Sequence, residues 1–205
     1  MRSIFVAGAA VALVLFFLLG RAAGHDADPA WLMALVAPLV GDATPLAIAF
    51  TASCYAYVLA PLCIVLLVAA WRVPAWRWRA VLLVVALLLA WQGADLFQHL
   101  FARPRRLDWV WKHETAFSYP SSHAAIATAV YLTLAVLIAR SALRYKAAAC
   151  TALVLLWAGI LWSRLALGAH YPTDLLGGIL WGTAVVLALA AAAPINVFEP
   201  LAGRR

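Results

Sequence analysis

Six continuous apolar stretches, each of about the length that a bilayer requires, divide this chain of 205 residues. A transmembrane helix needs about 20 consecutive, mostly apolar residues. The stretches lack the alternation of apolar and polar residues that marks the strands of a membrane β-barrel, so they predict helices. They are Ile4 to Gly20, Pro45 to Trp71, Ala80 to Gln98, Ser122 to Ala139, Ala147 to Trp162 and Pro172 to Ala193. We therefore expect an all-α protein, an integral membrane bundle of six transmembrane helices.

The composition supports a membrane protein with one domain. Hydrophobic residues make up 67% of the chain and charged residues only 11%, with a mean hydropathy of +0.98. An average soluble domain is about half apolar and about a quarter charged. This chain has too little polar surface to cover itself in water. Because the chain has no repeat, no linker and no separate soluble domain, we expect a single domain over residues 1–205.

Two of the stretches leave alternatives open. The first follows Met1 and Arg2 and has the charge pattern of a secretory signal peptide. Its apolar run is longer than a typical signal core, so we expect it to be retained as the first span. The second stretch is long enough to tilt in the membrane or to be broken at Pro61.

The net charge of +7 fits the orientation of a membrane protein better than nucleic-acid binding. With the N-terminus inside, nine basic residues fall on the inner side and six on the outer side. The inner ones are Arg2, Arg72, Arg77, Arg79, Arg140, Arg144, Lys146, Arg204 and Arg205; the outer ones are Arg21, Arg103, Arg105, Arg106, Lys112 and Arg164. This bias and the short loops predict a bacterial inner-membrane protein with no nucleic-acid partner.

The sequence AHYPTD between the last two spans is the first candidate for chemistry. Pro172 suits the first turn of a helix, where its missing N–H does no harm. Asp174 then lies in that first turn, from which a carboxylate can reach back toward the residues before the helix. A carboxylate on one nitrogen of His170 would fix its tautomer and leave the other nitrogen as a nucleophile. By itself the fragment also fits a plain helix cap beside a surface histidine.

The sequence PSSH at the start of the fourth span is the second candidate. A helix start presents free N–H groups and a partial positive charge, which suit an anion. His123 lies just inside this start, where it can give a proton to a bound group. The alternative is ordinary N-capping by Ser121 or Ser122, with His123 as a polar residue at the membrane interface.

Arginines gather on the same predicted side of the membrane. Arg103, Arg105 and Arg106 are close together before the fourth span, and Arg164 follows Ser163 at the end of the fifth. One guanidinium group can donate two parallel hydrogen bonds to the oxygens of a phosphate. The alternative is that these arginines contact lipid headgroups, as arginines at a membrane interface commonly do. Two histidines, an aspartate, a helix start and arginines together predict phosphoryl transfer by positioning and charge.

These motifs resemble those of the type 2 phosphatidic acid phosphatase (PAP2) superfamily, in its membrane lipid phosphatase branch. The family pattern has Lys, six residues and Arg-Pro; then Pro-Ser-Gly-His; then Ser-Arg, five residues, His, three residues and Asp. The third part is complete in Ser163, Arg164, His170 and Asp174. The second is present with Ser122 in the place of glycine. The core motifs lie within residues 95–176.

The first part of the pattern departs from the family. In the register that we prefer, Gln98 replaces the lysine, Arg105 is the family arginine and Arg106 replaces the final proline. The other register uses Arg103 and Pro104. In both registers the lysine is missing.

The resemblance implies a role for each matching residue. His170 would attack phosphorus and form a phosphohistidine, oriented by Asp174, while His123 would protonate the departing oxygen and later deprotonate water. The implied phosphate-binding residues are Arg105, Arg164, Ser121 and Ser122, with Gln98, Arg103 and Arg106 as further candidates. No metal ligand and no cofactor are implied.

Other polar residues of the outer side are expected to play smaller parts. Asp95, near the end of the third span, is expected to face the bundle, where it would pair with His99 or support the arginines. His25, Asp26 and Asp28 in the first outer loop are expected to be surface residues.

The implied function is hydrolysis of a lipid phosphate or pyrophosphate on the outer, periplasmic face of the inner membrane. The substrate and the bilayer are the only partners that we infer. Candidate substrates are undecaprenyl pyrophosphate, phosphatidylglycerophosphate, phosphatidate and lipid A phosphate. The alternatives are a lipid phosphotransferase and a degenerate protein that binds or transports lipid phosphates without turnover.

Metal dependence can be predicted from the sequence, which has no carboxylate or cysteine cluster with the spacing of metal ligands. We expect the purified protein to release phosphate from lipid phosphates in excess EDTA at an unchanged rate. Orthovanadate, which mimics five-coordinate phosphorus, should inhibit it. A loss of activity in EDTA that Mg²⁺ restores would contradict the prediction.

Overall fold

The computed structural model describes residues 2–41, 44–106, 110–112, 115–194 and 197–199. Every regular element in these ranges is helical. In chain order they are α1 (Arg2–Ala23), α2 (Ala30–Val36), η1 (Ala37–Leu39), α3 (Thr44–Ala52), α4 (Ala56–Arg72), η2 (Pro74–Trp76), α5 (Arg77–Phe101), α6 (Ser122–Ala127), η3 (Thr128–Leu132), α7 (Thr133–Ala139), α8 (Lys146–Ala166) and α9 (Pro172–Ala192). The prediction of an all-α protein is confirmed for the described residues.

Among the described residues, five helical segments are long and apolar enough to cross a membrane, and a bent pair could count as a sixth. The five are α1, η2 with α5, the segment Ser122–Ala139 built from α6, η3 and α7, then α8, and α9. They match five of the six predicted stretches closely. The chain is therefore a multi-pass membrane protein.

The second predicted span is wrong as one continuous helix. The chain breaks between α3 and α4, at residues 53–55, whereas Pro61 lies inside α4. The Ser53 hydroxyl donates to the Phe50 carbonyl (2.6 Å), and the Tyr131 hydroxyl donates to the Ser53 carbonyl (2.6 Å). These side chains satisfy backbone groups that a continuous helix would have paired, so the break is stable at membrane depth.

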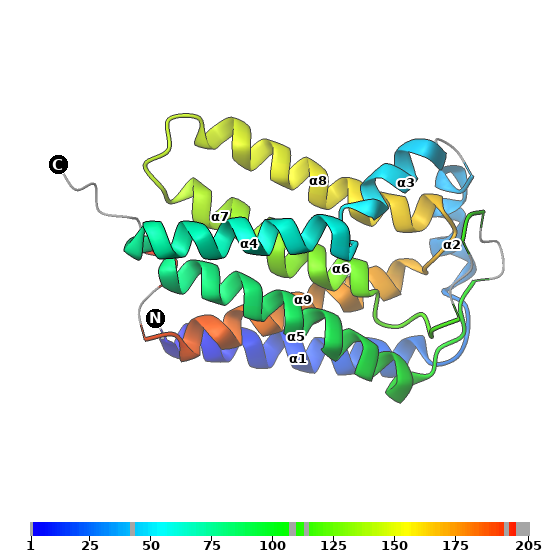
Figure 1. Cartoon of the computed structure of the whole chain (residues 1–205). Coiled ribbons are helices and arrows are strands. Elements are labelled where there is room, and N and C mark those ends of the chain that lie inside the picture. The colour runs from blue at the N-terminus through cyan, green and yellow to red at the C-terminus, as the bar shows by residue number, and fades with distance from the viewer. Residues whose placement is uncertain (1, 42–43, 107–109, 113–114, 195–196, 200–205) are drawn as a thin grey trace.

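The long helices lie side by side and run across the same thickness (Figure 1). α1 packs along α9, α4 along α5, and α3 against α8. The short helix α2 lies at one end of the bundle, where the chain from α5 to α6 also passes. The start of α1 lies at the opposite end. Both candidate motifs, at the starts of α6 and α9, therefore face the end that carries α2.

Three glycines of α9 permit its close contact with the segment before α6 and with α6 itself. A Cβ at Gly177 would overlap the ring of Tyr119, and one at Gly178 would overlap the Ser121 carbonyl oxygen. A Cβ at Gly182 would lie 2.6 Å from the Ala125 carbonyl oxygen. Small residues let helix backbones approach closely in membranes. This approach brings the start of α6 next to the start of α9.

Replacing Gly178 tests this packing. Gly178→Ala places a methyl group against backbone atoms, and overpacking costs about 1–3 kcal/mol. We expect a fall of several degrees in the unfolding temperature in detergent, together with loss of phosphatase activity. Gly8→Ala is the matched control, because its Cβ would meet only the flexible end of Leu187, at 3.0 Å. Equal unfolding temperatures for the two variants would contradict this account of the α6–α9 contact.

Candidate functional site

His170 lies in the connection between α8 and α9 and is fully buried. Its Nδ1 is 3.3 Å from Oδ2 of Asp174, and Nη1 of Arg105 is 3.2 Å from its Nε2. A carboxylate accepts and a guanidinium donates, so these partners assign the proton to Nδ1 and the lone pair to Nε2. The side chain is thus arranged as an oriented nucleophile whose reactive nitrogen faces a cation.

Asp174 is held in place by groups on both sides of the His170 contact. Its Oδ2 accepts from the backbone N–H of Tyr171 (2.9 Å), and its Oδ1 pairs with Nη1 of Arg103 (2.7 Å). The carboxylate therefore reaches back over the helix start as the sequence predicted. The helix-cap alternative and the orienting role are compatible, because the same carboxylate makes both contacts.

Arg103 is fully buried and contacts protein groups with each of its nitrogens. Its Nη2 pairs with Oδ1 of Asp28 (2.8 Å), its Nε and Nη2 donate to the Asp26 carbonyl, and Nη1 also donates to the Thr173 hydroxyl (2.7 Å). The ring of Tyr171 lies 4.3 Å from its guanidinium. These contacts indicate a structural side chain rather than a phosphate ligand.

The expectation that Asp28 is a surface residue is wrong. Asp28 is only 5% exposed, and its Oδ2 accepts from the backbone N–H of Thr173 (2.9 Å). The residues before α2 fold back over the start of α9, which brings this carboxylate under Arg103. His25 is exposed, as expected, and its Nδ1 lies 3.3 Å from the Ala102 carbonyl.

Arg105 and Arg164 approach the histidines from two different segments. Nε of Arg105 donates to the Ala116 carbonyl (2.6 Å), and Nη1 donates to the Ala169 carbonyl (3.1 Å). Arg164 is fully buried, and its Nη1 donates to the Thr51 hydroxyl (3.1 Å). Both guanidinium groups lie close enough to His170 to act on its charge. The register that assigns Arg105 to the family arginine is the one in which the arginine contacts this histidine.

His123 lies in the first turn of α6, with the other candidate residues around it. Ser121 is the N-cap and accepts from the Ala124 N–H (3.4 Å), while its own N–H donates to the Asp174 carbonyl (3.0 Å). Among the described residues neither ring nitrogen of His123 has a hydrogen-bond partner, although the side chain is buried. Arg105, Arg164 and His170 are within electrostatic range. A buried imidazole in this position can pass a proton to and from a bound group.

The remaining sequence candidates take different places. Gln98 is buried and donates to the Pro120 carbonyl (2.9 Å), so its amide holds the PSSH segment. Arg106 is 7% exposed, with its guanidinium 5.9 Å from the ring of Tyr171. Asp95 is exposed, which contradicts the expectation that it faces the bundle. The buried face of α5 here carries Ala94 and Gln98, and His99 binds the backbone carbonyl of Asp95 (2.8 Å) instead of its carboxylate.

The sequence reasoning also missed Thr51. Its hydroxyl is 2.9 Å from that of Ser163 and accepts from Arg164. Thr51 stands in an apolar run, where a lone threonine gives no signal of its own. The packing of α3 against α8 places this residue beside Ser163 and Arg164. Tyr55, in the break after α3, has its ring 5.8 Å from that of His123.

An apolar cavity of about 530 Å³ extends from His123 between α4 and α5. Ser122 and His123 line it together with Ala60 and Ile64 of α4 and Trp91 of α5. Ile64 and Trp91 are also exposed on the outside of the bundle. Exposed apolar residues of a membrane span contact lipid chains, so the cavity connects the histidine with the surrounding hydrocarbon.

The sequence profile of the PAP2 superfamily matches residues 79–197, more than half of the chain. The chain belongs to the PAP2 superfamily. This membership makes it a phosphatase of the metal-independent type. The matched residues include all three candidate motifs, whereas α1 to α4 lie before them.

One solved structure is similar over most of the chain. It is the crystal structure of the first transmembrane PAP2 type phosphatidylglycerolphosphate phosphatase from Bacillus subtilis. The TM-score is 0.74 at 20% sequence identity, and the match covers 88% of this chain and 93% of that chain. The two proteins therefore share a fold. The sequence finds no match among curated proteins.

The environment of His170 generates a prediction on pH. Burial and the positive charges of Arg105 and Arg164 lower the pKa of His170 well below its ordinary value of 6.5. Since only the neutral imidazole is nucleophilic, kcat/KM should fall when the pH drops through this lowered pKa. Arg105→Gln removes one positive charge, so we expect the acidic limb of kcat/KM to move to higher pH.

The test compares kcat/KM from pH 4.5 to 8 for the wild type and the variant, which share any titration of the substrate. Arg144→Gln, at an exposed basic residue near the other end of the bundle, is the matched control. An acidic limb that stays in place or moves to lower pH in Arg105→Gln would refute the prediction.

Proposed function

We propose that this chain hydrolyses a lipid phosphate or pyrophosphate through a phosphohistidine on His170. The observation that supports this most strongly is the pairing of its two ring nitrogens, with Asp174 at Nδ1 and Arg105 at Nε2. His123 lies nearby at an apolar cavity, where the oxygen that joins a phosphate to a lipid chain would meet a proton donor. The family match and the shared fold support a membrane phosphatase.

In the proposed reaction, Nε2 of His170 attacks phosphorus while the bond from phosphorus to the lipid-side oxygen breaks. His123 gives its proton to that oxygen, which leaves as an alcohol or, from a pyrophosphate, as a lipid monophosphate. Water then attacks phosphorus, His123 takes the proton, and the phosphorus–nitrogen bond breaks to release phosphate. Arg105, Arg164 and the N–H groups at the start of α6 would stabilise charge on the phosphoryl oxygens.

The cavity between α4 and α5 favours a substrate with a long apolar chain. Its volume of about 530 Å³ is within the roughly 300–1,000 Å³ of ligand pockets, and its walls are mostly hydrocarbon. The four candidate lipids all carry such chains. The likeness to the Bacillus subtilis protein favours phosphatidylglycerophosphate among them.

The orientation is part of the proposal. The basic ends of α4, α7 and α8 lie at the end of the bundle opposite the histidines. Under the positive-inside rule this end faces the cytoplasm, so the catalytic end would face the periplasm of a bacterial inner membrane.

The two alternatives make different predictions about His170. A protein that only binds lipid phosphates does not need an oriented nucleophile, so the His170–Asp174 contact argues against it. A phosphotransferase would form the same phosphohistidine but pass the phosphoryl group to a second lipid instead of water.

Trapping the intermediate tests the proposed function. Protein mixed with ³²P-labelled phosphatidylglycerophosphate and quenched in alkali should carry label on His170, as an acid-labile and base-stable adduct. Asp174→Asn should lose about 10⁴-fold in rate, the loss seen when the histidine of a serine protease triad loses its orienting carboxylate. Asp95→Asn, at an exposed carboxylate, is the matched control. Turnover without label on His170, or near-normal turnover by Asp174→Asn, would refute the mechanism, and label transferred to lipid would identify a phosphotransferase.

The orientation has a separate test in a background without Cys54, Cys63 and Cys150. Lys112→Cys lies at the catalytic end and Arg77→Cys at the other end, and both positions are exposed. We expect a membrane-impermeant thiol reagent to label the first variant and not the second in right-side-out vesicles. The reverse pattern would place the catalytic end in the cytoplasm.

A further inference from the structure

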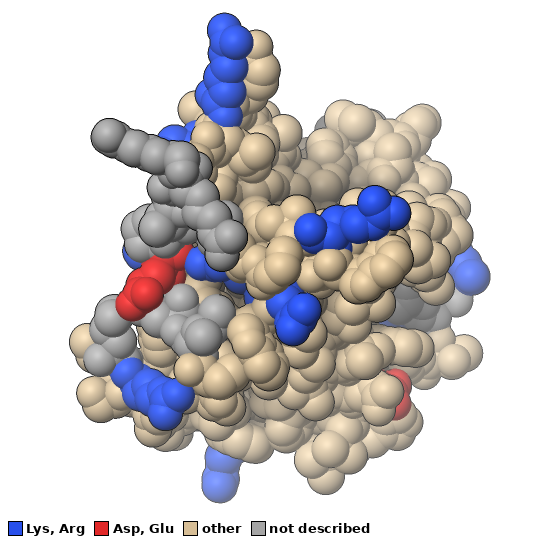
Figure 2. All heavy atoms as spheres, turned by 60° about the vertical axis from the view of Figure 1, so that its left-hand side comes forward, with Lys and Arg blue, Asp and Glu red and all other residues tan. Residues whose placement is uncertain are grey.

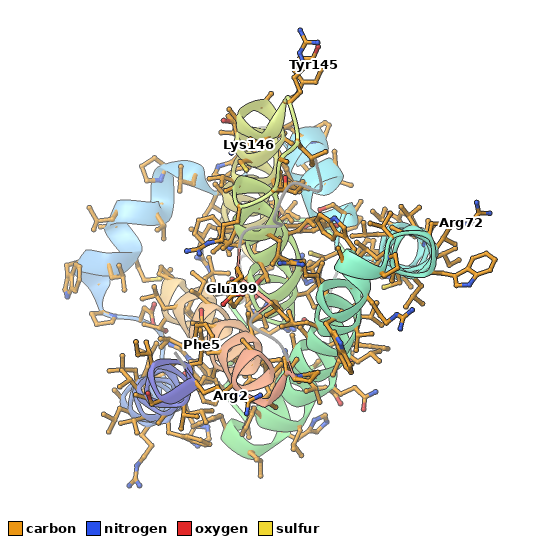
Figure 3. All side chains as sticks on the ribbon, turned by 90° about the vertical axis from the view of Figure 1, so that its left-hand side faces the viewer. Arg2, Phe5, Arg72, Tyr145, Lys146 and Glu199 are labelled. Atoms are coloured by element: carbon orange, nitrogen blue, oxygen red, sulfur yellow. The ribbon has the colours of Figure 1, made fainter. Side chains whose placement is uncertain are left out.

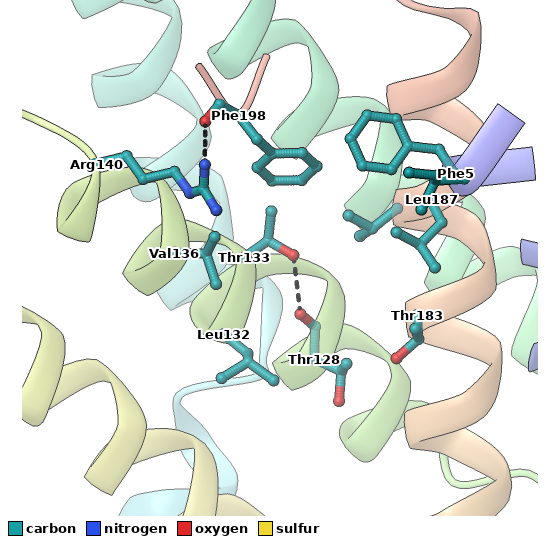
Figure 4. Close-up of a pocket in the computed structure, with 11 residues that line it drawn as sticks. Phe5, Thr128, Leu132, Thr133, Val136, Arg140, Thr183, Leu187 and Phe198 are labelled. Atoms are coloured by element: carbon teal, nitrogen blue, oxygen red, sulfur yellow. Dashed lines mark hydrogen bonds between the residues drawn. The ribbon is translucent and has the colours of Figure 1, made fainter. Parts of the chain in front are cut away.

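A second cavity lies at the end of the bundle away from the histidines. It has a volume of about 410 Å³ and is bounded by α1, η3, α7 and α9 (Figure 4). Its walls are mainly hydrocarbon, from Phe5, Leu132, Val136, Leu187 and Phe198. The volume falls in the roughly 300–1,000 Å³ range of ligand pockets. The cavity that adjoins His123 lies between other helices, α4 and α5.

Two of the threonines that line this cavity are hydrogen-bonded within the protein. Thr133 donates to the Thr128 carbonyl (3.2 Å), which lies in the π-helical turn η3, and Trp157 donates to the Thr128 hydroxyl (3.1 Å). Figure 4 shows the first of these bonds at the cavity wall. A cavity with such a lining favours an apolar occupant, because it offers few polar partners to water.

The cavity reaches the outside of the bundle within the membrane-spanning segments. Ile4 of α1 is 69% exposed and Val136 of α7 is 40% exposed, and both line the cavity. Exposed apolar side chains in spanning helices contact acyl chains. A lipid chain can therefore enter from the side without crossing the protein.

Arg140 is an exposed cation that lines the cavity where α7 ends. Its Nη1 donates to the Phe198 carbonyl (3.0 Å), which fixes the guanidinium beside the ring of Phe198 (Figure 4). A guanidinium has five N–H donors, so this bond leaves others for a phosphate group. Arg140 thus combines a fixed position with unused donors.

The whole end of the molecule around Arg140 is basic. Figure 2 shows Lys and Arg side chains spread over this face, with few acidic ones. In Figure 3, Arg2, Arg72 and Lys146 mark three separate helices of the same end, and Glu199 is the acidic residue labelled there. A surface of this kind attracts anionic lipid headgroups.

We propose that this cavity binds one acyl chain of an anionic phospholipid from the membrane leaflet opposite the catalytic site, with the lipid phosphate on Arg140. The apolar lining and lateral opening suit the chain, and the basic rim suits the headgroup. The lipid would bind as a ligand and not as a substrate. The segment Ser122–Ala139 has His123 in its first turn, and its second half lines this cavity. A bound lipid would therefore also stabilise the helical segment that contains His123.

Dioleoyl phosphatidylserine is a suitable probe, because it is a phosphodiester and not a phosphomonoester substrate. Delipidated wild-type protein should retain one molecule in native mass spectrometry, more tightly than dioleoyl phosphatidylcholine. Arg140→Gln should weaken retention by about tenfold, the usual effect of losing one charge-assisted hydrogen bond. Arg144→Gln, which also removes an exposed arginine but one that does not line the cavity, should change retention less than twofold.

A phosphatidylserine with a photoreactive acyl chain then locates the site. We expect crosslinks on residues 132–136, 183–187 and Phe198, and their loss in Thr183→Phe, which fills the cavity. Equal retention of both lipids, equal effects of the two arginine variants, or crosslinks confined to α4 and α5 would overturn the proposal. None of these readouts depends on turnover, so a failure of the proposed phosphatase reaction would be seen separately.

Discussion

The candidate site depends on the burial of one charged side chain, Arg103. A guanidinium removed from water is costly unless its charge and N–H groups are matched, and here Asp28 and Asp174 supply two carboxylates. These partners come from the residues before α2 and from the first turn of α9. Arg103 therefore links its own segment to the residues before α2 and to the start of α9. The same contacts hold the Asp174 carboxylate in the position where it orients His170. Arg105, two residues further on, presents its guanidinium to the histidine as well as to the Ala116 and Ala169 carbonyls.

Close packing in the membrane completes the arrangement. Gly178 lets the backbone of α9 approach Ser121, and the N–H of that serine bonds to the carbonyl of Asp174. The start of α6, with His123, is thereby held against the start of α9. The packing of α3 against α8 brings Thr51 to Arg164, and the start of α4 after the break lines the cavity beside His123. Contacts between helices thus determine how the buried histidines and their partners are arranged.

Hydropathy sufficed to predict five long helices, because a bilayer fixes both the length and the composition of a span. The spacing of His170 and Asp174 sufficed to predict their contact, because both lie within one turn of a predicted helix start. Burial of Asp28 was not predictable, since its partners are far away in the sequence and a short acidic segment ordinarily lies in water. The exposure of Asp95 was missed because a span end has no marked periodicity. The break after α3 depends on Tyr131, a residue of another helix.

The different roles of Arg103 and Arg105 are tested most directly by the unfolding temperatures of Arg103→Gln and Arg105→Gln in detergent, measured with and without orthovanadate. A bound phosphate mimic raises the unfolding temperature by an amount that increases with its affinity for the folded state at a given concentration. We predict that Arg103→Gln is destabilised by about 3–5 kcal/mol, because it leaves two buried carboxylates without their partner. Arg105→Gln should unfold near the wild-type temperature but lose most of the vanadate-induced rise. The opposite result would contradict this division of roles. In that case Arg103→Gln would be as stable as the wild type but show no vanadate-induced rise in unfolding temperature, and Arg105→Gln would keep that rise.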